Sequence, residues 1–295
     1  MWVASGFYDI VLAGGVEKAS AMGTPFGMRA YALFCDGRYE FPSGFHFTAA
    51  FALSAHLYCK KYNIPLEKLE DQMATVAIQS HEYSLKNPCA QFHKLITKED
   101  VLQSYMVSTP LRLLNCAPFS DGAAAVVIAS EDVAKKLVKK PIYIAGVGQA
   151  SSAKLSSQYK HLPHVRAREL SAKQAYSMAG LTPKDMDLCE LHDCFSIASF
   201  VASECMGFFD YGTAGDAWER GETRLGGKIP INISGGLKGK GHPVGATGCA
   251  QVCEITRQLR GEMVEQGRQV EDAKYGITDT LGSDGIIVNI ILSTK

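Results

Sequence analysis

Two histidines and one cysteine, carried by two short blocks, have the residue types that could do chemistry. The first block, Leu191-His192-Asp193-Cys194-Phe195, stands where a strand-like run passes into a helix-like run. Ligands of α/β sheets bind beyond the carboxyl ends of strands, so His192 and Cys194 can project into one cleft. A thiol near an imidazole and a helix N-terminus is expected to have a lowered pKa. The block therefore predicts Cys194 as a proton carrier or nucleophile and His192 as a donor or orienting group.

The second block is rich in glycine and contains the other histidine. It runs through residues 232–251, with glycines at 235, 236, 239, 241, 245 and 248 and the pair His242-Pro243. Glycine allows sharp turns and close approach, and Pro243 biases His242 towards an extended conformation. An imidazole on such a turn, beside the positive end of a helix, can stabilise negative charge. A single His–Cys pair is more often structural, but a second histidine at a strand-to-helix turn favours catalysis.

Other interpretations of these blocks are weaker. The glycine-rich block has no Gly-Lys-Ser/Thr, which excludes a P-loop, and its G-x-G-x-x-x-G is a weak dinucleotide pattern because no Rossmann-type strand follows. We rank a catalytic turn first, a dinucleotide site second and a structural loop third. Cys189, His192 and Cys194 lack the spacing of a zinc site, so no metal is predicted.

The elements that must position these blocks alternate between strands and helices, which predicts a layered α/β fold. Residues 139–141 (Lys-Lys-Pro) suggest a boundary near 140, which gives domains 1–140 and 141–295. Met1 to Gly6 resembles the tail of a helix. The strand at 9–15 is expected to end in a turn, and the strand at 121–130 to be buried. Expected strands cover 9–15, 121–130, 142–150, 186–191, 228–233 and two runs in 275–292 that meet at 282–285; expected helices cover 47–62, 66–86, 131–139, 167–180, 195–206 and 246–260.

Composition excludes several classes of function. The 295-residue chain has zero formal charge and a pI of about 7.1, which argues against a nucleic-acid or acidic-lipid surface. Apolar stretches are interrupted by charge, and the first residues lack a basic signal-peptide region, so no membrane span or leader is expected. Nine cysteines without any C-x-x-C predict reduced thiols and a cytoplasmic location.

Together the two blocks resemble those of thiolases. The glycine-rich block resembles the thiolase G-H-P block, and His192-Asp-Cys-Phe195 resembles the H-D-C-F block of the sterol-carrier-protein-type branch. The resemblance extends to residues 9–19, 87–92 and 115–127, and covers essentially the whole chain. It implies a five-layered αβαβα fold of two similar halves, with a loop domain at about 20–115 that shapes the acyl and coenzyme A site.

The implied activity is thiolytic cleavage or Claisen condensation of β-ketoacyl-CoA thioesters, with no cofactor beyond the coenzyme A thioester substrate. Eight aromatic residues within 26–51 suggest a pocket for a bulky or aromatic acyl group, although ordinary core packing is the simpler interpretation. The resemblance also implies a homodimer and, as in some relatives, a small zinc-ribbon/OB-type partner subunit.

Residue by residue, the resemblance assigns His242 to thiol activation and oxyanion donation. Cys194 becomes the acid/base for the α-proton, and His192 replaces an asparagine of the first oxyanion hole. The Gly282 amide would complete a second hole, and Ser234 and Gly235 would contribute to oxyanion or substrate binding.

One departure concerns the nucleophilic cysteine, which in thiolases precedes the strand matched by residues 9–13. No cysteine precedes Cys35 in this chain. We expect a fragment whose first half is truncated, and no cleavage of acetoacetyl-CoA by this polypeptide alone. A thiolase-like retro-aldolase, which needs no such cysteine, and a catalytically incomplete subunit that supports a partner are the alternatives. Replacing Cys194 by alanine discriminates between an enzyme and a scaffold.

Overall fold

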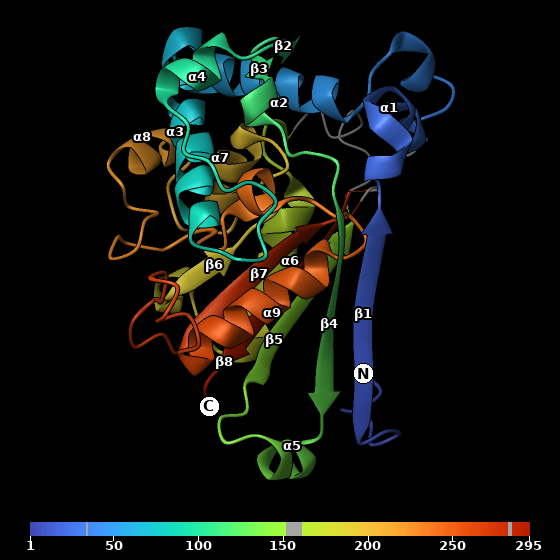
Figure 1. Ribbon diagram of the computed structural model, residues 1–295, viewed down its shortest axis with the longest axis vertical. Helices are drawn as coiled ribbons and strands as arrows, with labels where there is room; N and C mark the ends of the chain where they lie inside the picture. The colour runs from blue at the N-terminus through green and yellow to red at the C-terminus, as the bar shows by residue number, and fades with distance from the viewer. Residues whose placement is uncertain (34, 152–160, 283–284) are drawn as a thin grey trace.

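A four-stranded mixed sheet organises the C-terminal half of the molecule. The structure is a computed structural model that describes residues 1–33, 35–151, 161–282 and 285–295 (Figure 1). The strand order is β5 (Tyr143–Ser151), β8 (Ile286–Ser293), β7 (Tyr275–Leu281) and β6 (Leu188–Glu190). β5, β8 and β7 are antiparallel neighbours, whereas β6 runs parallel to β7. The strands predicted at 142–150, 186–191 and within 275–292 are confirmed, with β6 shorter than expected.

A second, two-stranded sheet is formed by β1 (Ile10–Lys18) and β4 (Asp121–Ala129), which pair antiparallel along their full length. Both strands alternate exposed and half-buried side chains, so the expectation of a buried strand at 121–130 is wrong. Large apolar side chains on the open face are exposed; they include Leu12, Val16 and Val127.

The strand expected to end at Gly14-Gly15 instead continues through both glycines to Lys18. Gly15 serves close approach and not a turn, because a Cβ atom there would lie 1.8 Å from the carbonyl oxygen of Gly245.

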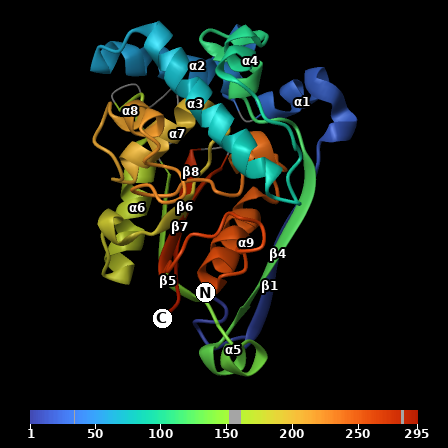
Figure 2. The same ribbon diagram turned by 60° about the vertical axis from the view of Figure 1, so that its left-hand side comes forward.

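The helices and the two sheets are layered (Figure 2). α9 (Thr247–Arg260) lies between the β1–β4 sheet and the four-stranded sheet, and α6 (Arg166–Ala179) covers the other face of the larger sheet. The described residues thus give four layers, β–α–β–α. Among them no helix covers the open face of β1 and β4, so the thiolase-like α/β fold is present with four of the five expected layers.

The chain between β1 and β4 forms a separate group of helices at one end of the sheets (Figure 1). Its elements are α1 (Gly23–Ala32), α2 (Phe47–Tyr62), α3 (Leu66–Leu85), α4 (Lys98–Gln103) and a small hairpin of β2 (Met106–Ser108) and β3 (Leu111–Arg112). These elements lie within the insertion expected at about 20–115, and the assignment of that segment as a loop domain stays a prediction. The main core joins α2 and α3 to α7 (Ser196–Cys205) and α8 (Ala214–Glu219); its largest members include Tyr58, Leu69, Met73, Phe200 and Trp218.

Smaller expectations have mixed outcomes. The exposed helix at 131–139 is α5 (Glu131–Leu137). The strand expected at 228–233 is wrong, since it is reduced to one bridge between Ile231 and Cys189. Met1 to Ser5 forms turns that close at Gly6, whose φ is 72°. Residues 283–284 of the expected turn lie outside the described residues. None of the helices described is both long and apolar enough to span a bilayer.

Candidate active site

The His192–Cys194 block occupies the irregular stretch between β6 and α7. β6 ends at Glu190, and the Leu191 amide then donates to the side-chain oxygen of Asn232 at 2.7 Å. The His192 amide donates to a carboxylate oxygen of Asp279, on β7, at 3.3 Å. Both polar contacts are buried, so the backbone entering the block is fixed from two sides.

The glycine-rich block begins beside the same strand. The Asn232 amide donates to the Cys189 carbonyl at 2.9 Å, which carries the backbone alongside β6. A π-helical turn follows over Gly236–Lys240, bounded by Gly235 and Gly241 with φ of 102° and 109°. These φ values favour glycine. A Cβ atom on Gly235 would in addition lie 2.8 Å from Ser84 of α3, so both the backbone conformation and the lack of space require glycine at this position.

A buried ion pair joins the two blocks. The Lys238 ammonium lies 2.6 Å from a carboxylate oxygen of Asp193 and also donates to the Asp193 carbonyl at 3.0 Å. The other carboxylate oxygen accepts the Leu237 amide at 2.8 Å. Both charged side chains are 1% exposed. Sequence reasoning missed this pair, and the only local signal is a lysine two residues before Lys240 in a glycine-rich turn.

The structure brings the two predicted histidines together. The rings of His192 and His242 lie edge to face, with centroids 4.9 Å apart and an interplanar angle of 82°. Burial and, to a smaller extent, the Arg168 and Lys238 cations lower the pKa of His192 to about 3. Burial and the neighbouring His192 also lower the pKa of His242 well below its usual value. Both imidazoles are therefore neutral at pH 7.

The tautomer of His242 follows from its hydrogen bonds. Its backbone amide donates to the Ser120 hydroxyl at 2.8 Å, and its Nδ1 lies 2.8 Å from the Thr247 hydroxyl. The Thr247 hydroxyl proton is donated to the Pro243 carbonyl at 3.1 Å. Because that proton is already used, Thr247 accepts from Nδ1–H, and Nε2 of His242 carries the free lone pair.

His192 has a polar atom free for a ligand. Its Nδ1 is buried and has no hydrogen-bond partner among the described residues. A buried polar atom left unpaired is costly, so this nitrogen is suited to a substrate oxygen or proton.

Cys194 is buried, but its acidity differs from the expectation. Burial and the adjacent Asp193 carboxylate raise the pKa of the Cys194 thiol to about 12, so the predicted thiolate character is wrong. Its carbonyl accepts the Ala117 amide at 2.8 Å, and a backbone hydrogen bond from Phe195 to the thiol offsets only part of the rise in pKa. Helix α7 begins at Ser196, and desolvation outweighs the effect of its N-terminus.

The three other predicted site residues are engaged in internal hydrogen bonds. The Gly282 amide donates to the Ile286 carbonyl at 2.7 Å, and the Gly235 amide donates to the Asn232 carbonyl at 3.0 Å. The Ser234 hydroxyl donates to Glu190 at 2.7 Å. These contacts hold the turns in place, and direct contact of any of the three with substrate stays a prediction.

Further polar residues support the block and were missed from the sequence. Asp279, which accepts the His192 amide, forms a fully buried ion pair with Arg168 of α6 at 2.8 Å. Each lies within an ordinary strand or helix pattern, so no local signal marks them. Among the residues described, no cluster of three histidine, cysteine or carboxylate side chains could hold a metal ion.

Comparisons with known proteins agree with this arrangement. A family model described as thiolase C-terminal domain-like matches residues 148–290. Acetyl-CoA acetyltransferase of Methanothermobacter thermautotrophicus is 43% identical over 285 residues, which are 97% of this chain and 72% of that protein. Sterol carrier protein 2 of Gallus gallus is 34% identical over 294 residues, 97% of this chain and 53% of that protein. The solved structure of the Ltp2-ChsH2(DUF35) aldolase matches with a TM-score of 0.86 and 25% identity, covering 99% of this chain and 74% of that one.

A mixed sheet that presents paired histidines and a buried thiol beyond its strand ends defines a thiolase-like α/β protein. The chain belongs to the thiolase superfamily, in its sterol-carrier-protein-type branch.

Proposed function

We propose that the chain belongs to an enzyme of thiolase-type acyl transfer, the cleavage or formation of the bond between the α- and β-carbons of β-ketoacyl-CoA thioesters. This polypeptide alone is expected to exchange α-protons but not to cleave acetoacetyl-CoA. The observation that carries this proposal is the edge-to-face contact of two neutral, buried imidazoles, His192 and His242, beside the Cys194 block. The neutral His192 ring can donate an N–H to an enolate oxygen in this water-poor site, whereas His242, whose only N–H is held by Thr247, can accept a proton at Nε2.

The protonation state of Cys194 suits the proton-donating step of cleavage. With a pKa of about 12, Cys194 is a thiol at neutral pH and therefore a proton donor. In cleavage, the bond between the α- and β-carbons breaks and its electron pair stays on the α-carbon as an enolate. The Cys194 S–H then supplies the proton that completes the acyl-CoA product, and the resulting thiolate can remove an α-proton in the reverse direction.

His242 is suited to activate the attacking thiol. Its Nδ1–H is held by Thr247, so its Nε2 lone pair can accept the proton of a thiol that attacks the β-carbonyl. The hydrogen bond between Nδ1 and the Thr247 hydroxyl orients the His242 ring, and the Ser120 hydroxyl accepts the His242 backbone amide. Removing Thr247 would leave the tautomer undetermined.

Exchange of α-protons tests the proposal, because it requires no nucleophilic cysteine. Acetyl-CoA in D₂O is expected to incorporate deuterium at its methyl group, followed by NMR. Cys194→Ala should slow this exchange at least 100-fold, in line with loss of a general acid/base. Cys205→Ala is the matched control, since Cys205 lies on the next helix and burial also raises the pKa of its thiol to about 12. Equal exchange by both variants would remove Cys194 from the mechanism and favour a non-catalytic, partner-supporting subunit.

Retro-aldol cleavage of acyl-CoA side chains is the second candidate. Similarity to the Ltp2-ChsH2(DUF35) aldolase supports it. The two candidates differ in substrate and in co-substrate. Cleavage of a β-hydroxyacyl-CoA without free coenzyme A would favour the aldolase, whereas α-proton exchange on acetyl-CoA without such cleavage would favour the thiolase.

Assembly, compartment and division of the chain belong to the same proposal. The exposed apolar face of β1 and β4 supports a homodimer, which light scattering would test. The name of the similar aldolase pairs Ltp2 with ChsH2(DUF35), which supports a small partner subunit. Nine free thiols support a reducing, cytoplasmic compartment. We place the boundary between two thiolase-like halves near residue 140, between α5 and β5.

A further inference from the structure

A buried carboxylate, Glu190, lies between the two blocks of the candidate site. Glu190 is the last residue of β6 and is 2% exposed. One of its carboxylate oxygens accepts the Ser234 hydroxyl at 2.7 Å, and the other accepts the Ser234 amide at 3.2 Å. The Lys240 ammonium lies 3.7 Å from the first of these oxygens. Glu190 thus contacts the glycine-rich block just before the π-helical turn Gly236–Lys240 and again at its last residue.

The Lys240 side chain depends on this carboxylate. Its ammonium nitrogen is buried and makes no hydrogen bond with any residue that the structure describes. A buried charge without a counter-charge is costly, so the position of the ammonium is expected to follow that of the Glu190 carboxylate. Lys240 also stands two residues before His242. The pKa of His242 is lowered first by burial and by His192, and the Lys240 cation adds to this effect, so that cation lies within electrostatic reach of the imidazole.

The other ionisable groups that face Glu190 are buried with it. Glu254 of α9 forms an ion pair with Arg268, which leaves Lys240 as the cation for Glu190 among the residues described. Burial raises the pKa of Glu190 to about 7; the Lys240 cation opposes this rise and the Glu254 carboxylate adds to it. The adjacent Cys189 thiol stays neutral, because burial raises its pKa well above the usual value. Glu190 therefore changes its charge near neutral pH.

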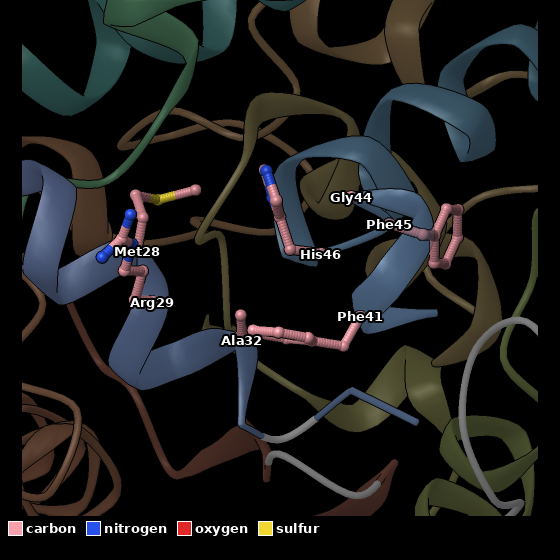
Figure 3. A pocket seen from close by; sticks show the side chains of 7 residues that line it. All are labelled: Met28, Arg29, Ala32, Phe41, Gly44, Phe45 and His46. Carbon is pink, nitrogen blue, oxygen red and sulfur yellow. The ribbon is translucent and has the colours of Figure 1, made fainter. Parts of the chain in front are cut away.

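Glu190 is not placed to touch a substrate. A cavity of about 270 Å³ lies between α1 and the start of α2, and its lining residues, all within 28–46, include neither Glu190 nor Lys240 (Figure 3). A smaller cavity beside α2, α6 and α7 is lined by neither of them as well. Any effect of Glu190 on the reaction is therefore exerted through the turn that it contacts.

We propose that Glu190 is a positioning residue for His242: its carboxylate, bonded to Ser234 and paired with Lys240, fixes the π-helical turn that leads to the imidazole. Ionised Glu190 holds both residues, whereas the protonated form keeps the bonds to Ser234 and loses its attraction for Lys240. Because the His242 ring packs against that of His192, a displaced turn disturbs the imidazole that faces the enolate. The inference rests on the proposed function, since it concerns the same pair of imidazoles.

The backbone of the turn has separate support, so variants at Glu190 should stay folded. The Asn87 side chain donates to the Ser234 carbonyl at 2.8 Å. The Gln91 amide donates to the Lys240 carbonyl, also at 2.8 Å. Neither bond involves the Glu190 carboxylate, and both remain when its charge is removed.

Glu190→Gln imitates the protonated carboxyl and tests the inference through α-proton exchange on acetyl-CoA. The ratio of the wild-type rate to the variant rate is compared at each pH, because the titration of the substrate and of Cys194 is common to both proteins. We expect a ratio near one at about pH 5.5 and near ten at about pH 8.5, in kcat and not in KM, the scale of one hydrogen bond to a charged group. Lys240→Met should cause the same loss at the higher pH, and the double variant should lose little more, because both changes remove one contact.

Asp187→Asn is the matched control. Asp187 lies just before the opposite end of β6, and its carboxylate accepts the amides of Lys274 and Tyr275 at 2.7 and 2.9 Å. The ratio of the wild-type rate to the rate of this variant should be the same at every pH. A ratio for Glu190→Gln that does not change with pH, or the same profile for both variants, would overturn the inference.

The NMR signals of the His242 ring give a readout that needs no activity. His242 stays neutral over this range, so a change in its ring signals reports a change beside it. The signals should shift as the pH passes through about 7 in the wild type and in Asp187→Asn, and not in Glu190→Gln. This pattern without any exchange would support the positioning of His242 and overturn the proposed function. Exchange by the wild type with ring signals that do not shift would overturn the positioning alone.

Discussion

Replacing Lys238 by methionine tests how strongly the buried ion pair between the two catalytic blocks holds them together. Methionine fills much of the space of the lysine stem but, among the residues described, leaves the Asp193 carboxylate with only the Leu237 amide as a partner for its oxygens. Both side chains of the pair are 1% exposed, so water cannot replace the ammonium group. Removing one partner of a buried pair costs about 3–5 kcal/mol. We expect Lys238→Met to lower the free energy of unfolding by about that amount.

Thermal unfolding followed by circular dichroism would measure the loss. The entropy of unfolding is about 2.1 cal/mol/K per residue, which gives roughly 0.6 kcal/mol/K for this chain. A loss of about 3–5 kcal/mol therefore lowers Tm by about 5–8 °C. The double variant Asp193→Asn with Lys238→Met removes both charges and should regain part of this loss, because no isolated charge stays buried.

Lys68→Met provides the matched control. Lys68 and Asp216 are separated by the same 2.6 Å, but their side chains are 47% and 42% exposed. Such an exposed pair contributes less than about 1 kcal/mol, which corresponds to less than about 2 °C in Tm. Equal shifts in Tm for Lys238→Met and Lys68→Met would refute the reasoning, because the buried pair would then contribute no more than a surface pair.

Two further predictions concern acidity and packing. The pKa of His192 is lowered to about 3, below its usual value of about 6.5, so the unfolded chain binds a proton that the folded chain does not. The free energy of unfolding should therefore fall as the pH drops from 6.5 towards 3, by up to about 1.4 kcal/mol per pH unit from this residue. Urea unfolding at several pH values measures this dependence, and His192→Asn should make it shallower. An unchanged pH dependence in His192→Asn would contradict the assignment. Gly15→Ala should cost at least about 1–3 kcal/mol and slow α-proton exchange, because its Cβ would lie 1.8 Å from the Gly245 carbonyl oxygen of the G-H-P turn. Gly14→Ala, whose nearest neighbours would lie 3.3 Å away, is its control for Tm and exchange rate, and equal effects would argue against the contact.

Elements set by local pattern are predictable from the sequence. The helix expected at 47–62 agrees with α2 at both ends, and the one expected at 66–86 ends one residue earlier, before Asn87-Pro88. The sequence predicts a turn at Gly14-Gly15, because the group that requires a small residue at Gly15, the Gly245 carbonyl, is distant in sequence. The run at 228–233 has strand-like composition, but only Ile231 finds a β partner.

In the candidate site too, features set by local sequence are predictable, whereas those set by distant partners are not. The meeting of His192 and His242 is predicted from strand-to-helix junctions in the sequence, but only His192 follows a strand of the structure, because the run at 228–233 is reduced to one bridge. The acidity of Cys194 does not, because a helix N-terminus is visible in the sequence whereas burial and the direction of the Asp193 carboxylate are not. Lys238 and Asp279 matter through partners far along the chain, which no local spacing indicates.

The bonds from Asp193 to Leu237 and Lys238 also constrain how the length of this protein can vary. One additional residue in 191–195 would displace His192, and one in 232–242 would displace His242, by up to about 3.8 Å, the spacing of consecutive Cα atoms. The other histidine would stay in place. Insertions or deletions on one side alone should therefore separate the rings of His192 and His242. For engineering, residues 191–195 and 232–242 form a single cassette, to be exchanged together or left intact.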